Sequence, residues 1–200
     1  MELVGPFDEK QIRAVRAGET VALSGCVFTG RDRLHKHFAD GGALPFDLRD
    51  GALFHCGPVV VPENGAWRVV AAGPTTSVRE EPYEADLIRR TGLRVIIGKG
   101  GMGAQTRAAC RECGCVYLQA VGGAAAAIAR CVKRVIGVHF LAEFGATEAV
   151  WELELVGLRA VVGIDAQGGD LFEAVRERSA AEFRKLIGRE DDANCVHGIV

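Results

Sequence analysis

Side chains that could bind an anion stand in four turns, each between an apolar, strand-like run and a helix-like run. The turns are residues 29–32, 73–79, 98–101 and 120–123. Arg31, Arg79 and Lys99 lie in the first three of them. α/β proteins bind anions at strand-to-helix turns, because unpaired backbone N–H groups meet the ligand there. We therefore predict a pocket for a small ligand with two negative charges.

The two arginines are suited to holding carboxylates, because a guanidinium grips a carboxylate with two parallel hydrogen bonds. A single arginine more often forms only a surface ion pair. Three cations in three equivalent turns favour a shared binding role for Arg31, Arg79 and Lys99. Asp32 is expected to orient Arg31 or to cap the helix that follows.

Thr75, Thr76 and Ser77 begin the helix-like run after the second turn, so at least one of these hydroxyls is expected to cap that helix. A hydroxyl that faces a cationic pocket can also act as a base. An alcohol is a weak base at neutral pH, but positive charge from Arg79 and Lys99 would stabilise its ionised form. Which of the three hydroxyls faces the ligand stays open in the sequence.

Residues 98–103, Gly-Lys-Gly-Gly-Met-Gly, match the G-x-G-x-x-G pattern of dinucleotide-binding turns. Such a site also needs an acidic residue about 20 positions later to bind the ribose hydroxyls. Residues 118–123 contain no carboxylate, which argues against a dinucleotide. We instead expect the glycines to allow close backbone approach, and the N-terminus of the following helix to bind the anion together with Lys99.

Cys110-x-x-Cys113-x-Cys115 resembles part of a metal-binding signature. A four-cysteine zinc or iron–sulfur site needs a fourth ligand, and isolated clusters usually have longer, regular spacing. We expect core or incidental thiols, with a small iron–sulfur or redox protein as the alternative. The histidines at 35, 37, 55 and 139 show no ligand spacing, although His35 lies one helical turn after Arg31. We assign no metal ligand to this chain.

Composition limits the protein class. The 200 residues fit one domain with a sizeable core, and the net charge of −2 with no basic stripe argues against nucleic acid as a partner. The apolar runs are too short and too interrupted to cross a membrane. The first residues lack a basic region followed by an apolar core, so no export signal is expected. Seven cysteines without such a signal indicate reduced thiols in the cytoplasm.

Strand-like and helix-like runs alternate along the chain, which predicts an α/β fold with a parallel portion between residues 94 and 140 and a partly antiparallel second layer. The predicted strands are residues 21–29, 52–61, 67–72, 94–97, 115–121, 134–140, 151–156 and 160–164. The predicted helices are residues 8–17, 31–39, 75–92 with an interruption at Pro82, 104–112, 124–131 and 171–187. A hairpin turn is expected at residues 62–65.

Six motifs together resemble the β subunit of class I fumarate hydratase and L(+)-tartrate dehydratase, which forms the C-terminal domain of single-chain members. The motifs lie at residues 29–36, 44–48, 55–58, 73–77, 97–103 and 121–126. The most specific features are Gly-Pro-Thr-Thr-Ser followed by an arginine and the Gly-Lys-Gly turn. The resemblance covers about residues 15–175, in the same order throughout.

The resemblance implies a single swivelling β/β/α domain with a mixed sheet. It places the domain at residues 19–175, after an N-terminal arm (1–18) and before a C-terminal helix and tail (176–200). The implied activity is reversible addition of water to a C4 dicarboxylate, fumarate to (S)-malate first among the candidates. The implied cofactor is a [4Fe–4S] cluster with one open iron, held by three cysteines of a partner α subunit in an α2β2 assembly.

Site roles also follow from the resemblance. Arg31, Arg79, Lys99 and Thr76 would bind the substrate, Thr75 would be the base, and Lys99 would also take part in catalysis. Many fumarase relatives have Gly-Arg-Met-Asp where this chain has Val-Arg-Glu-Glu at residues 78–81, so fumarate and tartrate both stay open. A non-catalytic dicarboxylate-binding module is a further alternative.

Overall fold

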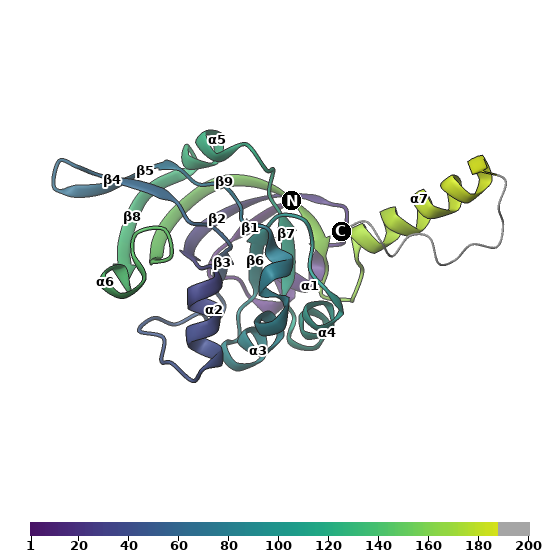
Figure 1. The fold of residues 1–200 in the computed structure, drawn as a ribbon, viewed down its shortest axis with the longest axis horizontal. Helices are drawn as coiled ribbons and strands as arrows, with labels where there is room; N and C mark the ends of the chain where they lie inside the picture. Colours follow the sequence, from purple (N-terminus) through teal and green to yellow (C-terminus); the bar gives the residue numbers. More distant parts are fainter. Residues whose placement is uncertain (188–200) are drawn as a thin grey trace.

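The computed structural model describes residues 1–187, and its centre is a barrel-like ring of strands (Figure 1). The strands are β1 (Glu2–Val4), β2 (Thr20–Thr29), β3 (Ala52–Phe54), β4 (Val59–Glu63), β5 (Ala66–Ala71), β6 (Val95–Gly98), β7 (Val116–Gln119), β8 (Val132–His139) and β9 (Val150–Ile164). The helices are α1 (Glu9–Ala14), α2 (Asp32–Ala39), the 3₁₀ helix η1 (Ser77–Glu80), α3 (Glu81–Thr91), α4 (Ala104–Cys113), α5 (Ala125–Ala129), α6 (Leu141–Phe144) and α7 (Leu171–Ile187).

The main sheet has the order β1-β2-β3-β6-β7-β9-β8, and an additional pairing between β2 and β9 closes the ring. Strands β1, β2, β3, β6 and β7 run parallel, whereas β9 runs antiparallel to β2, β7 and β8. Strand β9 pairs with β2 along one edge. Along its other edge, the first part of β9 pairs with β8 and its last residues pair with β7. The prediction of a single α/β domain with a mixed sheet is confirmed.

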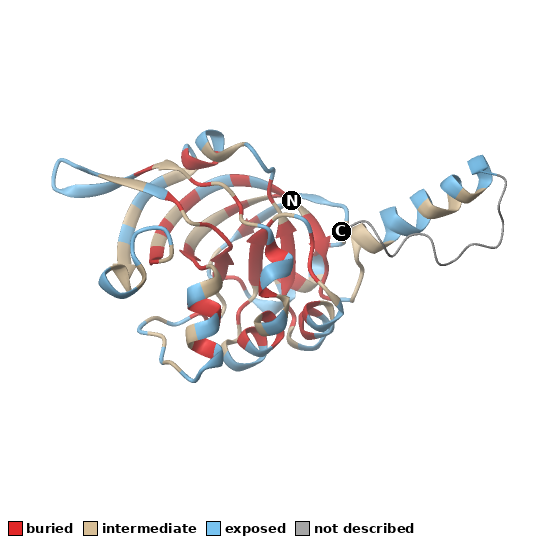
Figure 2. Cartoon of the chain, viewed as in Figure 1, coloured by how far each residue is buried: buried red, intermediate tan, exposed pale blue. Residues whose placement is uncertain are grey.

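Alternate residues of the parallel strands face two hydrophobic clusters, as the period of two along a β-strand requires. In β3, Phe54 belongs to one cluster and Leu53 to the other, and in β6 the pair Ile97 and Ile96 divides in the same way. The second cluster also contains residues of α2, α3 and α4. These three helices lie side by side against the strands with buried inner faces and exposed outer faces (Figure 2).

The predicted division of the chain differs from the structure at several places, and β1 and α6 were not predicted. Residues 150–164 form one strand of 15 residues rather than two, because β2 pairs with it on both sides of Gly157, whose φ is +66°. Strand β8 pairs antiparallel with β9 and is not part of the parallel portion. The predicted strand 52–61 is divided into β3 and β4. Pro82 lies in the first turn of α3, where its missing N–H costs no helical hydrogen bond.

Strands β4 and β5 form a separate antiparallel hairpin that projects from the ring (Figure 1). Its turn residues, Asn64 and Gly65, both have positive φ, at 51° and 78°. Asn and Gly are the residues that favour this geometry, which matches the twist of the flanking strands. The predicted hairpin turn is confirmed, and β5 leads the chain directly into residues 73–77.

The N-terminal residues, expected to form an arm over 1–18, contribute β1 and α1 to the folded body. Leu3, Phe7, Ile12 and Val15 are fully buried in the main core cluster. Whether residue 19 is a domain boundary stays a prediction. Helix α7 spans the residues expected of it, buries no side chain and extends away from the body (Figure 1). The tail predicted after α7 lies outside the described residues.

Within residues 1–187, no helix combines the length and apolar character that crossing a membrane demands.

Replacing Leu3 by Ala should lower the free energy of unfolding by about 2–5 kcal/mol, because the change leaves a cavity in the core. Val4 points to solvent with 51% of its surface exposed, so Val4→Ala serves as the matched control and should change stability by less than about 0.5 kcal/mol. Urea unfolding followed by circular dichroism measures both. Equal, small losses would show that the N-terminal segment is not part of the core.

Candidate functional site

The loops that follow the parallel strands meet at one edge of the sheet, because parallel strands end on the same side. Beyond the ends of β3 and β6, residues 73–77 lie between the two loops. Thr75 donates its backbone N–H to the His55 carbonyl at 2.6 Å, and Ser77 donates its own to the Lys99 carbonyl at 3.0 Å. Single bridges join Cys56 to Pro74 and Thr76 to Lys99. The second and third predicted turns are therefore in direct contact.

Arg31 and Arg79 come together through a carboxylate of the chain itself. Asp32 forms an ion pair with Arg79, and the same Oδ2 atom lies 4.0 Å from Nη2 of Arg31. Nε of Arg31 also lies 3.3 Å from Glu148 Oε1. A Cβ on Gly57 would stand 2.7 Å from Arg31 Nη1, so the guanidinium packs closely against the loop after β3. Asp32 thus binds Arg79 in addition to its contact with Arg31.

Lys99 is the third cation at this edge. Its side chain runs along the loop after β7, since a Cβ on Gly122 would lie 3.5 Å from Lys99 Cδ. Among residues 1–187, Arg31 and Arg79 each have a carboxylate partner, whereas the Lys99 ammonium has none. Lys99 is half-buried, which makes its charge more effective toward a ligand than a fully solvated one would be.

The three hydroxyls of the second turn have different surroundings. Thr76 precedes η1 without making a side-chain capping bond, so the expected cap does not form there. Ser77 is fully buried and hydrogen-bonded inward, which removes it as the hydroxyl that faces a ligand. Thr75 is half-buried and Thr76 is exposed at the edge that carries the cations.

The N-terminus of α4 does not act as the predicted anion site, because Glu81 occupies it. The Glu81 carboxylate accepts backbone N–H bonds from Gly103 at 2.7 Å and Gln105 at 3.0 Å, and a hydroxyl bond from Thr106 at 2.6 Å. A carboxylate at a helix N-terminus is stabilised by the unpaired amides there. The prediction of a ligand at this helix end is therefore wrong, whereas the Lys99 ammonium of that turn has no carboxylate partner in residues 1–187.

Behind the cations lies a buried group of polar side chains on α2, η1, α3 and the loop after β3. One carboxylate oxygen of Glu84, Oε2, lies 2.8 Å from His35 Nε2 and 3.1 Å from His55 Nε2. On its other ring nitrogen, His35 lies 2.9 Å from the Arg31 carbonyl. His55 Nδ1 lies 3.0 Å from Ser77 Oγ. His35, His55, Ser77 and Glu84 are all fully buried.

The charges in this group are set by mutual contact. Burial opposes a charge on His35, but the facing Glu84 carboxylate outweighs it and raises the pKa of His35 to about 9. Burial also works against a charge on Glu84, yet the two imidazoles lower its pKa to about 2. Burial lowers the pKa of His55, which favours a neutral ring. The group therefore consists of a His35–Glu84 ion pair beside a neutral His55.

Glu80 is the fourth titratable group here, with Oε2 at 3.3 Å from His35 Nδ1. Neither of its carboxylate oxygens has a hydrogen-bond partner among the described residues. Burial raises the pKa of Glu80 to about 7, well above its ordinary value. The carboxyl group is therefore largely protonated in slightly acidic solution.

The sequence predicted the three cations as binding residues, but it predicted neither a role for Glu84 nor a partner for His55. The available signal was local: Glu80 and Glu84 stand one helical turn apart on a face otherwise lined by Ala85 and Leu87. Two carboxylates on a buried helix face require partners of opposite charge. That pattern predicts a buried ion pair, although it does not identify the histidines.

The cysteine motif forms no metal site in the described residues. Cys110 and Cys115 are fully buried in the second hydrophobic cluster, and Cys113 packs against it. The six described cysteines, at 26, 56, 110, 113, 115 and 131, are free thiols. Within residues 1–187, His35, His55 and Glu84 are the group whose ligand atoms lie close enough together to hold an ion, within 4.8 Å of one another.

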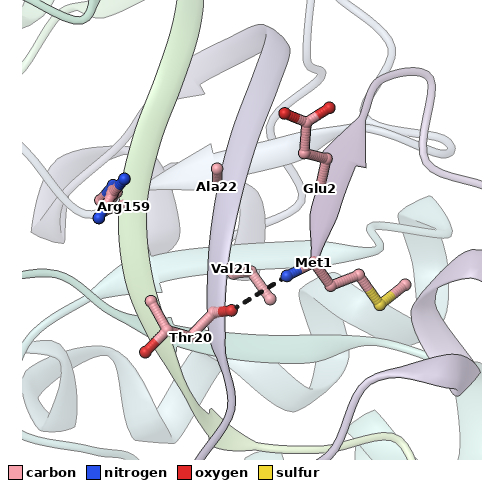
Figure 3. A pocket seen from close by; sticks show the side chains of 6 residues that line it. All are labelled: Met1, Glu2, Thr20, Val21, Ala22 and Arg159. Atoms are coloured by element: carbon pink, nitrogen blue, oxygen red, sulfur yellow. Dashed lines mark hydrogen bonds between the residues drawn. The ribbon is translucent and has the colours of Figure 1, made fainter.

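A surface hollow of about 300 Å³ lies at the start of β2 (Figure 3). Arg31 follows the opposite end of the same strand. Glu2 and Arg159 are the charged side chains among the residues that line it. Thr20 accepts a hydrogen bond from the terminal amine of Met1 across the hollow at 3.4 Å. None of the residues predicted for the site lines this hollow.

Comparison with known proteins gives a consistent result. Residues 1–175 match the family model described as Fumarase C-terminus. A protein of Geobacillus stearothermophilus, provisionally named a class I fumarate hydratase, is 47% identical over 185 residues. That alignment covers 92% of this chain but 36% of the relative, so this chain spans about a third of its length.

Two relatives of similar length carry another name. A Methanocaldococcus jannaschii protein, provisionally named L(+)-tartrate dehydratase subunit beta, is 37% identical across 90% of this chain and 95% of its own. The L(+)-tartrate dehydratase subunit beta of Escherichia coli K12 is 31% identical across 95% of this chain and 91% of its own.

Glu80→Gln should flatten the dependence of stability on pH. The folded state keeps a proton on Glu80 up to about pH 7, whereas the unfolded chain releases it near its ordinary pKa of 4.5. Wild-type stability must therefore fall as pH rises through this window. The variant cannot ionise, so its stability relative to wild type should rise from pH 5 to 8 by on the order of 2 kcal/mol.

Urea unfolding at several pH values measures this difference. Glu112→Gln, at an exposed position on α4, is the control and should show a constant offset. A constant offset for Glu80→Gln as well would mean that Glu80 is ionised in the folded protein.

Proposed function

Because this chain belongs to the Fumarase C-terminus family, we propose that it is the β subunit of an iron–sulfur-dependent hydro-lyase acting on a C4 dicarboxylate. Its membership confirms the resemblance that the six motifs indicated. Reversible hydration of fumarate to (S)-malate is the proposed reaction, and the closed ring with α2, α3 and α4 on one side is compatible with the swivelling β/β/α class. L(+)-tartrate dehydration is the second candidate, because two relatives of matching length carry that name.

One observation carries the proposal: Arg31 and Lys99 from two loops and Arg79 from η1 stand at one sheet edge, together with the Thr75–Thr76 hydroxyls. Arg31 and Arg79 already hold a carboxylate between them, that of Asp32. Their spacing therefore suits carboxylate binding, and Lys99 adds a charge that no carboxylate of residues 1–187 neutralises. A C4 diacid carries two carboxylates, which this set of cations would neutralise.

In the proposed reaction, Arg31, Arg79, Lys99 and Thr76 bind the substrate carboxylates and Thr75 removes a proton from the carbon next to one of them. Loss of that proton builds negative charge, which the nearby Arg79 and Lys99 would stabilise. The same positive charge favours the ionised form of the Thr75 hydroxyl. Lys99 therefore serves both in binding and in catalysis.

This chain's own thiols do not fit the [4Fe–4S] cluster of the proposed activity. Cys110 and Cys115 are packed in apolar surroundings, and Cys113 lies at their margin. Burial raises the pKa of Cys115 well above its ordinary value, which opposes the thiolate that iron requires. We propose that a partner α subunit holds the cluster in an α2β2 assembly. The free thiols support a reducing compartment such as the cytoplasm.

The departure from the fumarase pattern at residues 78–81 has structural reasons in this chain. Glu80 is buried beside His35, and Glu81 caps α4. Neither carboxylate faces the edge where the cations stand, so these two residues do not distinguish fumarate from tartrate.

The function is tested by combining the chain with its cognate α subunit under anaerobic conditions and loading the cluster. Loss of fumarate absorbance, and appearance of a keto acid from L(+)-tartrate, are followed in parallel. We expect turnover of fumarate that depends on both chains. A correctly loaded complex that turns over neither diacid would reduce this chain to a dicarboxylate-binding module.

Lys99→Met should lower kcat/KM by roughly 100-fold or more, because a charge that stabilises the transition state is lost from a partly buried site. Its thermal unfolding should stay close to wild type. Lys36→Met is the matched control, since Lys36 is exposed on α2 and pairs with Asp40. Equal activity of the two variants would remove Lys99 from the site.

A further inference from the structure

We propose that Glu84, His55 and Ser77 are positioning residues whose buried hydrogen-bond chain holds the Lys99 loop against residues 75–77. The inference rests on the proposed function in so far as that loop binds substrate. None of the three side chains reaches the exposed edge of the site. Each would act through Lys99 and Thr75 rather than on the substrate.

The Ser77 hydroxyl stands at the centre of these hydrogen bonds. Its hydroxyl oxygen lies 3.2 Å from the Lys99 backbone nitrogen, 3.1 Å from the Tyr117 hydroxyl and 3.0 Å from His55 Nδ1. A hydroxyl has one proton to donate and two lone pairs to accept with. Three partners therefore use its full capacity, and a fourth bond to a ligand is excluded.

The direction of each bond follows from the donors. The Lys99 amide can only donate, and the Tyr117 hydroxyl donates to Ser77 as well. Ser77 must then donate its own proton to His55 Nδ1. His55 is left with its proton on Nε2, which it donates to Glu84. The carboxylate thus selects one tautomer of His55, and that tautomer orients the Ser77 hydroxyl.

Close packing leaves these hydrogen-bonded residues little freedom to rearrange. A Cβ on Gly98 would lie 1.8 Å from Ser77 Oγ, so glycine at this position is what allows the hydroxyl to reach the Lys99 amide. The Ser77 backbone N–H also binds the Lys99 carbonyl at 3.0 Å. Ser77 therefore contacts Lys99 through both its side chain and its backbone, and Lys99 cannot shift without breaking buried bonds.

Glu84 can stay ionised in this interior because His35 neutralises it. The cost of burying a lone carboxylate is several kcal/mol, and a paired, hydrogen-bonded one avoids most of it. The charged and titratable groups that face His35 are Glu80, Glu84 and His55. Those that face His55 are Glu84, His35 and, at longer range, Asp32.

A metal ion is the competing interpretation, since His35, His55 and Glu84 have the composition of a zinc site. Two contacts argue for hydrogen bonds instead. Nε2 of His35 and Nε2 of His55 lie 2.8 and 3.1 Å from the same oxygen, Oε2 of Glu84, and both distances are ordinary hydrogen-bond lengths. The remaining nitrogens also have partners, Ser77 and the Arg31 carbonyl.

The first test uses the full chain, labelled with ¹⁵N-histidine, and NMR at pH 7. We expect His55 as the neutral tautomer with its proton on Nε2, and His35 as the imidazolium. Spectra of His35→Asn and His55→Asn assign the signals. A proton on His55 Nδ1, a neutral His35, or stoichiometric zinc or iron bound by these residues in the purified chain would overturn the proposal.

The second test measures kinetics of the complex with the α subunit. Ser77→Ala should lower kcat/KM by about 10- to 100-fold, as expected when a residue that orients a catalytic group is removed. It should also shift the Lys99 amide resonance in the chain alone. His55→Asn keeps an acceptor for Ser77 and should retain more activity than His55→Leu.

Leu3→Ala is the control for stability, because Leu3 lies in the core apart from this chain of bonds. It should lose stability with little change in kcat/KM. If Ser77→Ala behaves like Leu3→Ala and leaves the Lys99 resonance unmoved, the positioning role is wrong. If the wild-type complex with the α subunit is inactive, the proposed function is wrong. The NMR spectra of the chain alone would still show which nitrogens of His35 and His55 carry protons.

Discussion

The site depends on one insertion: residues 73–77 occupy the space that opens where β3 and β6 stop pairing. The two strands are paired up to Phe54 and Ile97, and beyond that point their loops separate. The inserted segment satisfies backbone groups on both sides, through the His55 carbonyl and the Lys99 carbonyl. It brings residues from the β4–β5 side of the molecule to the end of a sheet to which they do not otherwise belong.

The insertion also explains why charges accumulate on both sides of it. Buried polar backbone and side chains require partners, and the inserted segment supplies Ser77 to the interior and leaves Thr75 and Thr76 toward the surface. On the inner side, the charges of Glu84 and His35 neutralise each other. On the outer side, Arg31 and Arg79 share Asp32, while Lys99 has no such partner in residues 1–187. An anion that binds there meets a cationic surface that is already ordered.

Much of this arrangement could be predicted from local pattern. The turns after apolar runs predicted the edge where the loops meet, because parallel strands end together. Helix α7 was predicted over its full length. The missing parts depend on side chains that cross between elements. The side chain of Glu81 extends from α3 to cap α4, and that of Glu84 extends from α3 to His55 in the loop after β3. Neither role is visible in the spacing of residues along one helix. The continuity of β9 likewise depends on partners on both of its edges rather than on its own sequence.

Closure of the ring has a consequence for how the chain is made. Phe28 of β2 pairs with Glu152 of β9, so the two strands that complete the barrel are separated by most of the polypeptide. During synthesis, the outer edge of β2 has no partner until β9 has left the ribosome, and an unpaired strand edge invites association with other chains. Contacts between such distant segments also form slowly. Folding of this chain is therefore expected to finish only after translation of residue 164, with the nascent N-terminal half needing protection until then.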